Sequence, residues 1–462
     1  MVRRLVVISN RVAVPTAQGG KGAQGGLAGA LTAALKERHG LWLGWSGETA
    51  EQPSSDPEIQ AHEGVTTATI DLTPTDVEEY YNGYSNATLW PLFHYRVDLA
   101  LFQRETAKGY ERVNEHFASC AAPLIDPDDL VWIHDYHFMP LGHRLRERGL
   151  ANRIGFFLHI PWPATDLLVS LPYHQRLVRT LLAYDLIGFQ SDEWRANFLD
   201  YCAKELGAGV DAETGRVELD GEVTLARTFP IGIDWDYFQA QGRTEEAREA
   251  EQRMRDSTRQ RTAMIGVDRL DYSKGLPERM EGVAQLFETY PDMRRKMVYI
   301  QIAPPSRSDV ESYQQIRSTL ERKTGRINGE FSEIDLVPIR YVNKGHSAAE
   351  LYGCFRAAKI GLVTPLRDGM NLVAKEYVAA QDPDDPGILI LSRFAGAAQQ
   401  LTDAVLVNPH SPDELAHAMN TACAMPLEER KRRWESMMSC VREETVQRWA
   451  ENFCADLAET SH

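Results

Sequence analysis

Short apolar runs rich in β-branched residues alternate along the chain with amphipathic segments. The runs in the first half are LVVIS (5–9), LWLGW (41–45), DLVWIH (129–134), RIGFFLHI (153–160) and DLIGF (185–189). Those in the second half are AMIGV (263–267), MVYIQIA (297–303), LVPIRYV (336–342), KIGLVT (359–364) and GILILS (387–392). Continuous hydrophobicity predicts strands that are covered on both faces, as in parallel sheets. Helical patterns lie between them, at 164–183, 192–206, 309–323 and 372–381. The chain is therefore predicted to be α/β.

A polar stretch near the middle divides this pattern in two. Residues 239–261 carry almost no large apolar side chain and predict a solvated helix or a linker, while 211–222 predict a surface hairpin. Residues 428–455 predict one long charged helix. We expect two doubly wound domains, whose ligands bind at the carboxyl ends of the strands. Their expected bounds are 1–235 and 236–440, with 441–462 forming a C-terminal helix that packs back on the first domain.

Composition narrows the class of protein. Of 462 residues, 43% are hydrophobic and 25% charged, which is typical of a globular enzyme of two or three domains. The net charge of -16 disfavours nucleic acid and anionic lipid as partners. No signal-peptide or membrane-spanning pattern is found, and the six scattered cysteines form no C-x-x-C pair, so we expect a cytoplasmic protein with reduced thiols.

A glycine-rich loop follows the first strand. Gly20, Gly22 and Gly25 fit the dinucleotide pattern G-x-G-x-x-G, but the strand ends at Ser9, too far upstream for a nicotinamide site. Nor is this a Walker loop, because no Ser or Thr follows Lys21. Two readings remain open. Either Gly25 and Gly26 hold an anion at a helix N-terminus beside Arg11, or the loop is a plain surface loop with Arg11 solvated.

Two segments of the second half also suit anions. In GVDRLDYSKGL (266–276), Arg269 and Lys274 at a strand's carboxyl end suit a diphosphate, although Asp268 and Asp271 could instead neutralise them in a surface ion-pair loop.

In TPLRDGMNLVAKEYVAA (364–380), an Asp-Gly turn leads into a helix that begins near Asn371. Its first amides are free to face an anion, and Asp368 and Glu376 could accept hydrogen bonds from sugar and ribose hydroxyls. The alternative is a purely structural turn, with Glu376 beside Lys375.

Motifs of one known family occur along nearly the whole chain, in the same order as in that family. They are SNR (9–11), WSGE (45–48), LWPLFHYR (89–96), WIHDYH (132–137), LHIPWP (158–163), GFQ (188–190), FPIGID (229–234), DRLDYSKG (268–275), QIAPPSR (301–307) and LVTPLRDGMNLVAKEYVAAQ (362–381). The chain resembles the retaining trehalose-6-phosphate synthases of glycosyltransferase family 20. The resemblance implies the GT-B fold, two Rossmann-like domains facing across a deep cleft. It also implies transfer of glucose from UDP-glucose to the anomeric hydroxyl of glucose 6-phosphate, with no cofactor and no metal.

The resemblance also implies roles for particular residues. Glucose 6-phosphate would be bound by Arg11, Tyr81, Trp90, Asp135 and Arg307. UDP-glucose would be bound by Gly25, Gly26, His159, Arg269, Lys274, Asp368, Gly369, Met370, Asn371, Leu372, Val373 and Glu376. The catalytic set would be Arg269, Lys274, Asp135 and His159, which would assist a front-face displacement without a protein nucleophile.

Several alternatives stay open. His134, Asp135 and His137 have a spacing that admits a metal. Around His346 the sequence departs from the family pattern, which leaves the choice among UDP-, ADP- and GDP-glucose open, and Trp162 stands where a smaller aromatic is expected. A pseudo-glycosyltransferase and a non-catalytic sugar-phosphate sensor are the alternative functions, and association into a homo-oligomer is left undecided.

Overall fold

The chain forms two compact units. The computed structural model describes residues 3–12, 31–32, 34–36, 38–54, 56–62, 64–258, 261–305 and 311–460. One unit comprises Met1–Ile231 and Val446–His462, and the other comprises Gly232–Thr445. The sequence places these boundaries at 235/236 and 440/441, so the second expected boundary falls inside a helix, α17 (Leu427–Glu443).

The first unit is built on a mostly parallel sheet. Its strands in the described residues are β1 (Leu5–Arg11), β2 (Leu41–Thr49), β3 (Glu58–His62), β4 (Val65–Leu72), β5 (Leu130–His134), β6 (Arg153–Phe157), β7 (Leu186–Phe189), β8 (Gly209–Asp211), β9 (Arg216–Leu219) and β10 (Glu222–Thr228). They are ordered β3-β4-β2-β1-β5-β6-β7-β10-β9-β8, with antiparallel pairs only at the two edges. Strands β5, β6 and β7 are almost wholly buried, as their continuous apolar runs predict.

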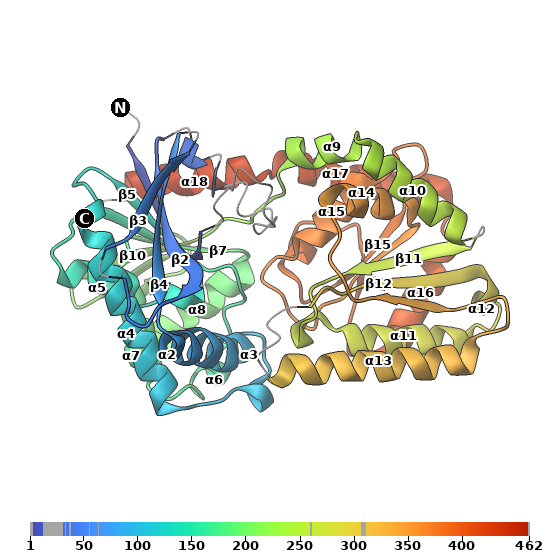
Figure 1. The fold of residues 1–462 in the computed structure, drawn as a ribbon, viewed down its shortest axis with the longest axis horizontal. Coiled ribbons are helices and arrows are strands. Elements are labelled where there is room, and N and C mark those ends of the chain that lie inside the picture. The colour runs from blue at the N-terminus through green and yellow to red at the C-terminus, as the bar shows by residue number, and fades with distance from the viewer. Residues whose placement is uncertain are drawn as a thin grey trace. The chain divides into compact units, whose positions relative to one another are not determined.

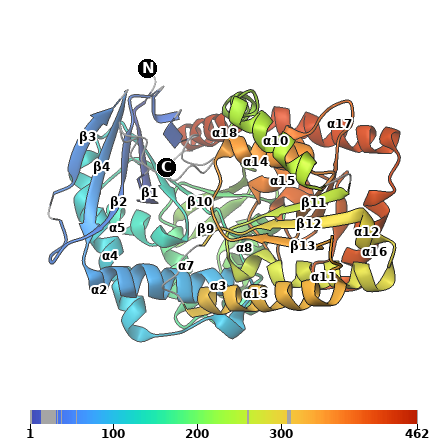
Figure 2. The ribbon, with the colours of Figure 1, turned by 45° about the vertical axis from the view of Figure 1, so that its right-hand side comes forward.

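Helices cover both faces of this sheet. The α-helices of the unit, within the described residues, are α2 (Pro74–Asp76), α3 (Trp90–Phe93), α4 (Arg104–Ala121), α5 (Leu141–Glu147), α6 (Thr165–Leu168), α7 (His174–Leu181), α8 (Asp192–Glu205) and α18 (Val446–Glu459). Figure 2 shows α18, drawn in red, beside the strands of this unit. Its Phe453 stacks on Trp132 with ring centroids 4.4 Å apart, and a Cβ added at Gly155 would lie 2.7 Å from the Phe453 ring. The end of the chain thus completes the core of the first unit.

The second unit holds a wholly parallel sheet. Its strands are β11 (Thr262–Val267), β12 (Met297–Ile302), β13 (Ile339–Val342), β14 (Ile360–Val363), β15 (Ile388–Ser392) and β16 (Val405–Val407), ordered β13-β12-β11-β14-β15-β16 in the part of the chain that is described. Its α-helices are α9 (Trp235–Gly242), α10 (Glu245–Thr258), α11 (Leu276–Thr289), α12 (Met293–Lys296), α13 (Glu311–Phe331), α14 (Ala348–Ala357), α15 (Leu372–Ala380), α16 (Pro412–Cys423) and α17. Figure 1 shows α11 and α13 on one face of this sheet and α14 and α15 on the other. The α/β prediction is confirmed.

Three expected elements differ from the structure. The single helix expected over 164–183 is interrupted between α6 and α7, where Tyr173 takes a left-handed φ of 61°. The long C-terminal helix is two helices, α17 and α18, and a Cβ at Gly232 would lie 1.7 Å from the Glu444 carbonyl oxygen at their junction. The polar stretch 239–261, predicted as a solvated helix or a linker, is helical, but α10 is not wholly solvated, because it buries Ala247, Ala250 and Met254 and packs on α14.

Candidate functional site

Four neighbouring strands of the first unit bring polar residues to one edge of the sheet. Strands β1, β5, β6 and β7 are adjacent and parallel, so their carboxyl ends lie at the same edge. Arg11 is the last residue of β1, Asp135 follows β5, His159 follows β6 and Gln190 follows β7. This is the edge at which open α/β sheets bind ligands.

The turn after β5 holds Asp135 in an uncommon conformation. Its φ is 75°, a value that residues other than glycine rarely adopt. Such residues are found most often at functional sites. Its amide donates to the Phe157 carbonyl at 2.8 Å, and its carboxylate Oδ1 accepts from the His159 amide at 3.2 Å. The ends of β5 and β6 are thereby fixed to one another.

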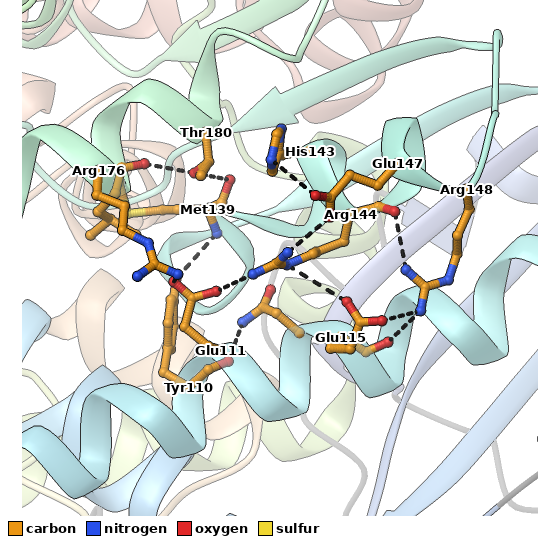
Figure 3. A network of polar contacts seen from close by, with 12 residues as sticks. Tyr110, Glu111, Glu115, Met139, His143, Arg144, Glu147, Arg148, Arg176 and Thr180 are labelled. Carbon is orange, nitrogen blue, oxygen red and sulfur yellow. Dashed lines mark hydrogen bonds and ion pairs between the residues drawn. The ribbon is translucent and has the colours of Figure 1, made fainter.

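Helix α4 supports the same turn from below. Tyr110 donates its hydroxyl to the Tyr136 carbonyl at 2.6 Å and accepts from the Met139 amide at 3.2 Å, while Asn114 donates to the His137 carbonyl at 3.0 Å. Figure 3 shows Tyr110 beside Met139, next to ion pairs of Arg144 on α5 with Glu111 and Glu115 on α4, which tie the two helices together. These contacts fix the turn that carries Asp135.

Two of the expected acceptor residues, Arg11 and Tyr81, meet through one indole ring. The Arg11 guanidinium lies 4.3 Å from the ring centroid of Trp45, and the Tyr81 ring meets Trp45 edge-on at 5.7 Å. On the other side, Tyr81 stacks on His137 with centroids 5.9 Å apart and an interplanar angle of 13°. Trp45 belongs to this group although the sequence predicts no function for it, and for His137 the sequence admits only a role as a metal ligand; the motifs WSGE and WIHDYH contain them.

Tyr81 is carried by η1 (Val77–Leu89), a π-helix, and Trp90 follows as the first residue of α3. Turns of π-helix are rare, and those that occur often lie at functional sites. Trp90 is 5% exposed, and its ring lies 4.2 Å from that of His94 and 5.7 Å from that of Tyr136. Trp90 is thus joined through Tyr136 to the turn that holds Asp135.

His159 forms the centre of a small neutral cluster. Its Nε2 lies 3.1 Å from Nδ1 of His134, and its Nδ1 lies 3.3 Å from Nε2 of Gln190. Burial lowers the pKa of His159 to about 3 and holds the pKa of His134 well below its usual value. Both rings are therefore uncharged at neutral pH and cannot serve as cations for a phosphate.

In the second unit, charge gathers at the equivalent edge. Strands β11 and β14 are adjacent and parallel, and their carboxyl ends lead to Lys274 and Asp368. Lys274 forms an ion pair with Asp368, and Asn371 Nδ2 donates to the same Asp368 oxygen at 3.0 Å. Arg269 is exposed after the end of β11. An anion with two phosphate groups would find two cations here, one of them held by a displaceable carboxylate.

A buried arginine on α11 supports the Lys274 loop. Arg279 has no exposed surface and donates to Asp268 at 2.8 Å, to Thr364 Oγ1 at 2.9 Å and to Gln301 Oε1 at 3.0 Å. It therefore connects the end of β11 with the end of β14. Sequence reasoning missed this residue, yet a signal exists, since Arg279 shares the helix face of buried Leu276 and Val283.

The turn into α15 has a fixed path. Asn371, its N-cap, has a φ of 74°. The Asp368 carbonyl accepts from the Gly396 amide at 3.2 Å, and the Met370 carbonyl accepts from the Ala397 amide at 2.9 Å. A Cβ at Gly396 would lie 1.9 Å from the Gly369 carbonyl oxygen, so no other residue fits there without a shift. Beyond this turn the amides of the first helical residues, Leu372 and Val373 among them, have no partner within the helix and suit an anion.

Glu376 and Lys375 lie one turn further along α15. Burial raises the pKa of Glu376 to about 7, and desolvation lowers the pKa of the fully buried Lys375 to about 8. The two are not a surface ion pair of fixed charge. Glu376 is partly exposed and can still accept hydrogen bonds from a ligand.

Some expected residues take no part in what is described. Gly25, Gly26 and Arg307 lie outside the described residues. His346 pairs with Glu350 at 3.1 Å beside the start of α14, which favours its reading as a loop residue. Trp162 is buried against Phe198 and Phe189, with ring centroids 5.0 and 6.1 Å away, and so contributes packing.

In the described part of the chain, no three His, Cys, Asp or Glu side chains are grouped so as to hold a metal ion. His134 is directed to His159, and His137 to Tyr81. None of the helices in the described segments is both long enough and apolar enough to span a bilayer.

Comparison with known proteins gives full-length matches. The sequence model of glycosyltransferase family 20 matches residues 3–459. A trehalose-6-phosphate synthase of Sinorhizobium fredii is 47% identical over 460 residues, 99% of each chain. An α,α-trehalose-phosphate synthase of Burkholderia xenovorans, solved with glucose-6-phosphate, superposes with a TM-score of 0.93 at 46% identity and covers 98% of this chain and 100% of its own. The E. coli trehalose-6-phosphate protein bound with UDP-2-fluoro glucose gives 0.94 at 43% identity, covering 99% of each chain.

Proposed function

The chain belongs to glycosyltransferase family 20, and we propose that it moves glucose from UDP-glucose to the anomeric hydroxyl of glucose 6-phosphate, forming α,α-trehalose 6-phosphate and UDP. The observation that carries this proposal is the charged edge of the second sheet, where Lys274, Arg269 and the start of α15 gather on a chain of net charge -16. Such a site suits a nucleoside diphosphate sugar. The glucose-6-phosphate and UDP-2-fluoro glucose bound to the structural relatives agree with the two substrates.

The acceptor is assigned to the edge of the first sheet. Arg11 and Arg307 would neutralise the phosphate, because a guanidinium fork matches phosphate oxygens in a bidentate way. Tyr81 and Trp90 would lie against the sugar, and the Asp135 carboxylate would accept from its hydroxyls. The Asp135–His159 hydrogen bond supports this, since it holds the carboxylate in place before a ligand arrives.

The donor is assigned to the edge of the second sheet. Lys274 would leave Asp368 for the diphosphate, which frees Asp368 to accept from hydroxyls of the donor glucose. Arg269 and the amides from Gly369 to Val373 would hold the phosphates, Glu376 would accept from the ribose hydroxyls, and Gly25 and Gly26 would let the first loop approach the diphosphate closely. The preformed Lys274–Asp368 pair supports this exchange of partners.

The transfer would keep the α configuration by a front-face route. The bond between C1 of glucose and the β-phosphate oxygen breaks, and its electron pair leaves with UDP. Arg269, Lys274 and the helix amides stabilise the growing charge. The acceptor hydroxyl then attacks C1 from the same face and gives its proton to the β-phosphate. No protein carboxylate needs to form a covalent bond, and no cofactor enters the reaction.

The test is a rate assay with purified protein, UDP-glucose and glucose 6-phosphate, with UDP release followed enzymatically and the disaccharide identified by NMR. We expect stoichiometric UDP and an α,α-linked product, with full activity in EDTA. ADP- and GDP-glucose in parallel define the nucleotide preference. Binding of both substrates without turnover would instead indicate a sugar-phosphate sensor, and turnover only with cyclitol substrates a pseudo-glycosyltransferase.

A further inference from the structure

Gln190 holds two parts of the first unit together at the sheet edge. It follows β7, is 2% exposed, and contacts His159 through its side-chain nitrogen. Its side-chain oxygen accepts from the Ile231 amide at 2.9 Å. Ile231 is the last residue before the chain enters the second unit. The motifs GFQ and FPIGID therefore meet in one hydrogen-bonded chain.

The directions of these hydrogen bonds follow from the Ile231 amide. A backbone N–H can only donate, so the Gln190 atom that faces it must be Oε1, and Nε2 must face His159. Since Nε2 of an amide can only donate, Nδ1 of His159 is an acceptor and carries no hydrogen. A neutral His159 must then carry its hydrogen on Nε2 and donate it to Nδ1 of His134.

The chain of bonds ends in a buried group. His134 is 1% exposed, and by the same logic it carries its hydrogen on Nε2, for which no hydrogen-bond partner exists among the described residues. The Trp449 ring of α18 packs over both histidines, with centroids 6.2 Å from His134 and 5.9 Å from His159. Both ring nitrogens of His159 are thus engaged inside the protein.

We propose that Gln190 is a positioning residue that fixes His159 as its Nε2–H tautomer and so keeps the ends of β5 and β6, which carry Asp135, in place for the reaction. The imidazole then serves as a strut between β5, β6 and β7. The backbone amide of the same residue donates to the Asp135 carboxylate at 3.2 Å. The part of this inference that concerns the reaction rests on the proposed function, whereas the tautomer does not.

The tautomer can be measured without substrate. Deuterated protein with ¹³C,¹⁵N-labelled histidine, assigned with His159→Gln, should show Nδ1 of His159 unprotonated. Gln190→Glu keeps an acceptor for Ile231 but turns a second acceptor toward Nδ1, so a hydrogen should appear on Nδ1. Gln190→Met can neither donate to nor accept from Nδ1 of His159, so it should give a mixture of the two neutral tautomers. A hydrogen on Nδ1 in the unaltered protein, or none there in the Glu variant, would overturn the assignment.

Kinetics test the consequence for the reaction. Gln190→Glu should lower kcat about 10- to 100-fold, the scale of a small misplacement at a reacting centre, with the KM for UDP-glucose changed less than about 3-fold. Gln381→Glu is the matched control, because Gln381 is 5% exposed and likewise accepts from a backbone amide, that of Gly387, at 2.9 Å. An equal loss in both variants would remove the positioning role. An unaltered protein without transferase activity would defeat the proposed function and leave the tautomer result standing.

Discussion

Both sheets carry their candidate binding residues at the carboxyl ends of parallel strands, but the residues differ in kind. At the edge of the first sheet, aromatic rings and uncharged histidines surround one described cation from the expected set, Arg11, which lies over Trp45. At the edge of the second sheet, Lys274 pairs with Asp368 above a fully buried Arg279–Asp268 pair. One site is shaped by rings, the other by charges.

Magnitudes show what this difference implies. An exposed guanidinium over an aromatic ring contributes about 0.5–1 kcal/mol. Because Arg11 is exposed, it contributes little to stability and remains available to a ligand. Removing one partner of a buried ion pair costs about 3–5 kcal/mol, because a charge is left buried without compensation. The first edge can therefore lose its cation without unfolding, whereas the second depends on its buried pair for shape.

The largest expected effect is that of Arg279→Met. It leaves Asp268 buried and unpaired, and we expect a loss of about 3–5 kcal/mol in the free energy of unfolding, measured with urea. Arg279→Met with Asp268→Asn should recover part of the loss. Arg11→Met should change stability by less than about 1 kcal/mol. Similar losses for Arg279→Met and Arg11→Met would break the contrast between the two edges.

Lys274→Ala and Arg269→Ala should each lower kcat about 100-fold or more, because each removes a preorganised charge from the leaving diphosphate. Steady-state rates at saturating substrates measure this. Lys359→Ala is the control, since Lys359 pairs with Asp385 on the surface of the same unit at 2.7 Å and should keep its rate within about 2-fold. Near-normal turnover in either Lys274→Ala or Arg269→Ala would refute the leaving-group role.

Much of this contrast was predictable from the sequence. Arg269, Lys274 and Asp368 lie in the loops that follow apolar runs, and the parallel-sheet rule alone brings these loops to one edge. The Lys274–Asp368 pair joins residues 94 positions apart, and that meeting depends on β11 and β14 being neighbours. Local sequence patterns do not reveal the order of strands in a sheet, so the Lys274–Asp368 pair could be found only in the structure.

Hydrophobic periodicity in the sequence does not predict several other features, for physical reasons. The π-helix η1 has no distinct sequence period, and β3 and β4 carry few continuous apolar residues. The Gln190–His159–His134 chain joins three strand ends through side chains whose roles depend on hydrogen direction. By contrast, the sequence predicts a helix over 428–455, but its break after α17 depends on a tertiary contact at Gly232.

Arg11→Ala sharpens the comparison from the side of the first edge. Losing a charge-assisted contact to a phosphate costs about 1.5–3 kcal/mol, so the KM for glucose 6-phosphate should rise about 10- to 100-fold. The KM for UDP-glucose should stay within about 3-fold. Arg216→Ala, in the β9 hairpin of the same unit, should change neither value. Equal losses for both substrates would count against an acceptor role for Arg11.

The smallest expected effect concerns Glu376, whose protonation should make donor binding at the second edge depend on pH. Burial raises its pKa to about 7, so it gains a proton as the pH falls from 8 to 6 and accepts fewer hydrogen bonds from a ribose. With glucose 6-phosphate saturating, the KM for UDP-glucose should rise several-fold over this range, and Glu376→Gln should flatten that rise. The same rise in both proteins would assign it to another group.

The stability of the protein offers a second check on Glu376. Because the folded-state pKa lies above the unfolded value, the stabilisation from holding this proton is complete below about pH 4.5 and is lost as the pH rises through about 7. Glu376→Gln removes that loss. The variant should therefore gain stability relative to the unaltered protein between pH 5 and pH 8, as urea unfolding at both pH values would measure. A pH-independent difference would mean that Glu376 is already ionised at pH 5, in which case the second edge owes its donor affinity to fixed charges alone.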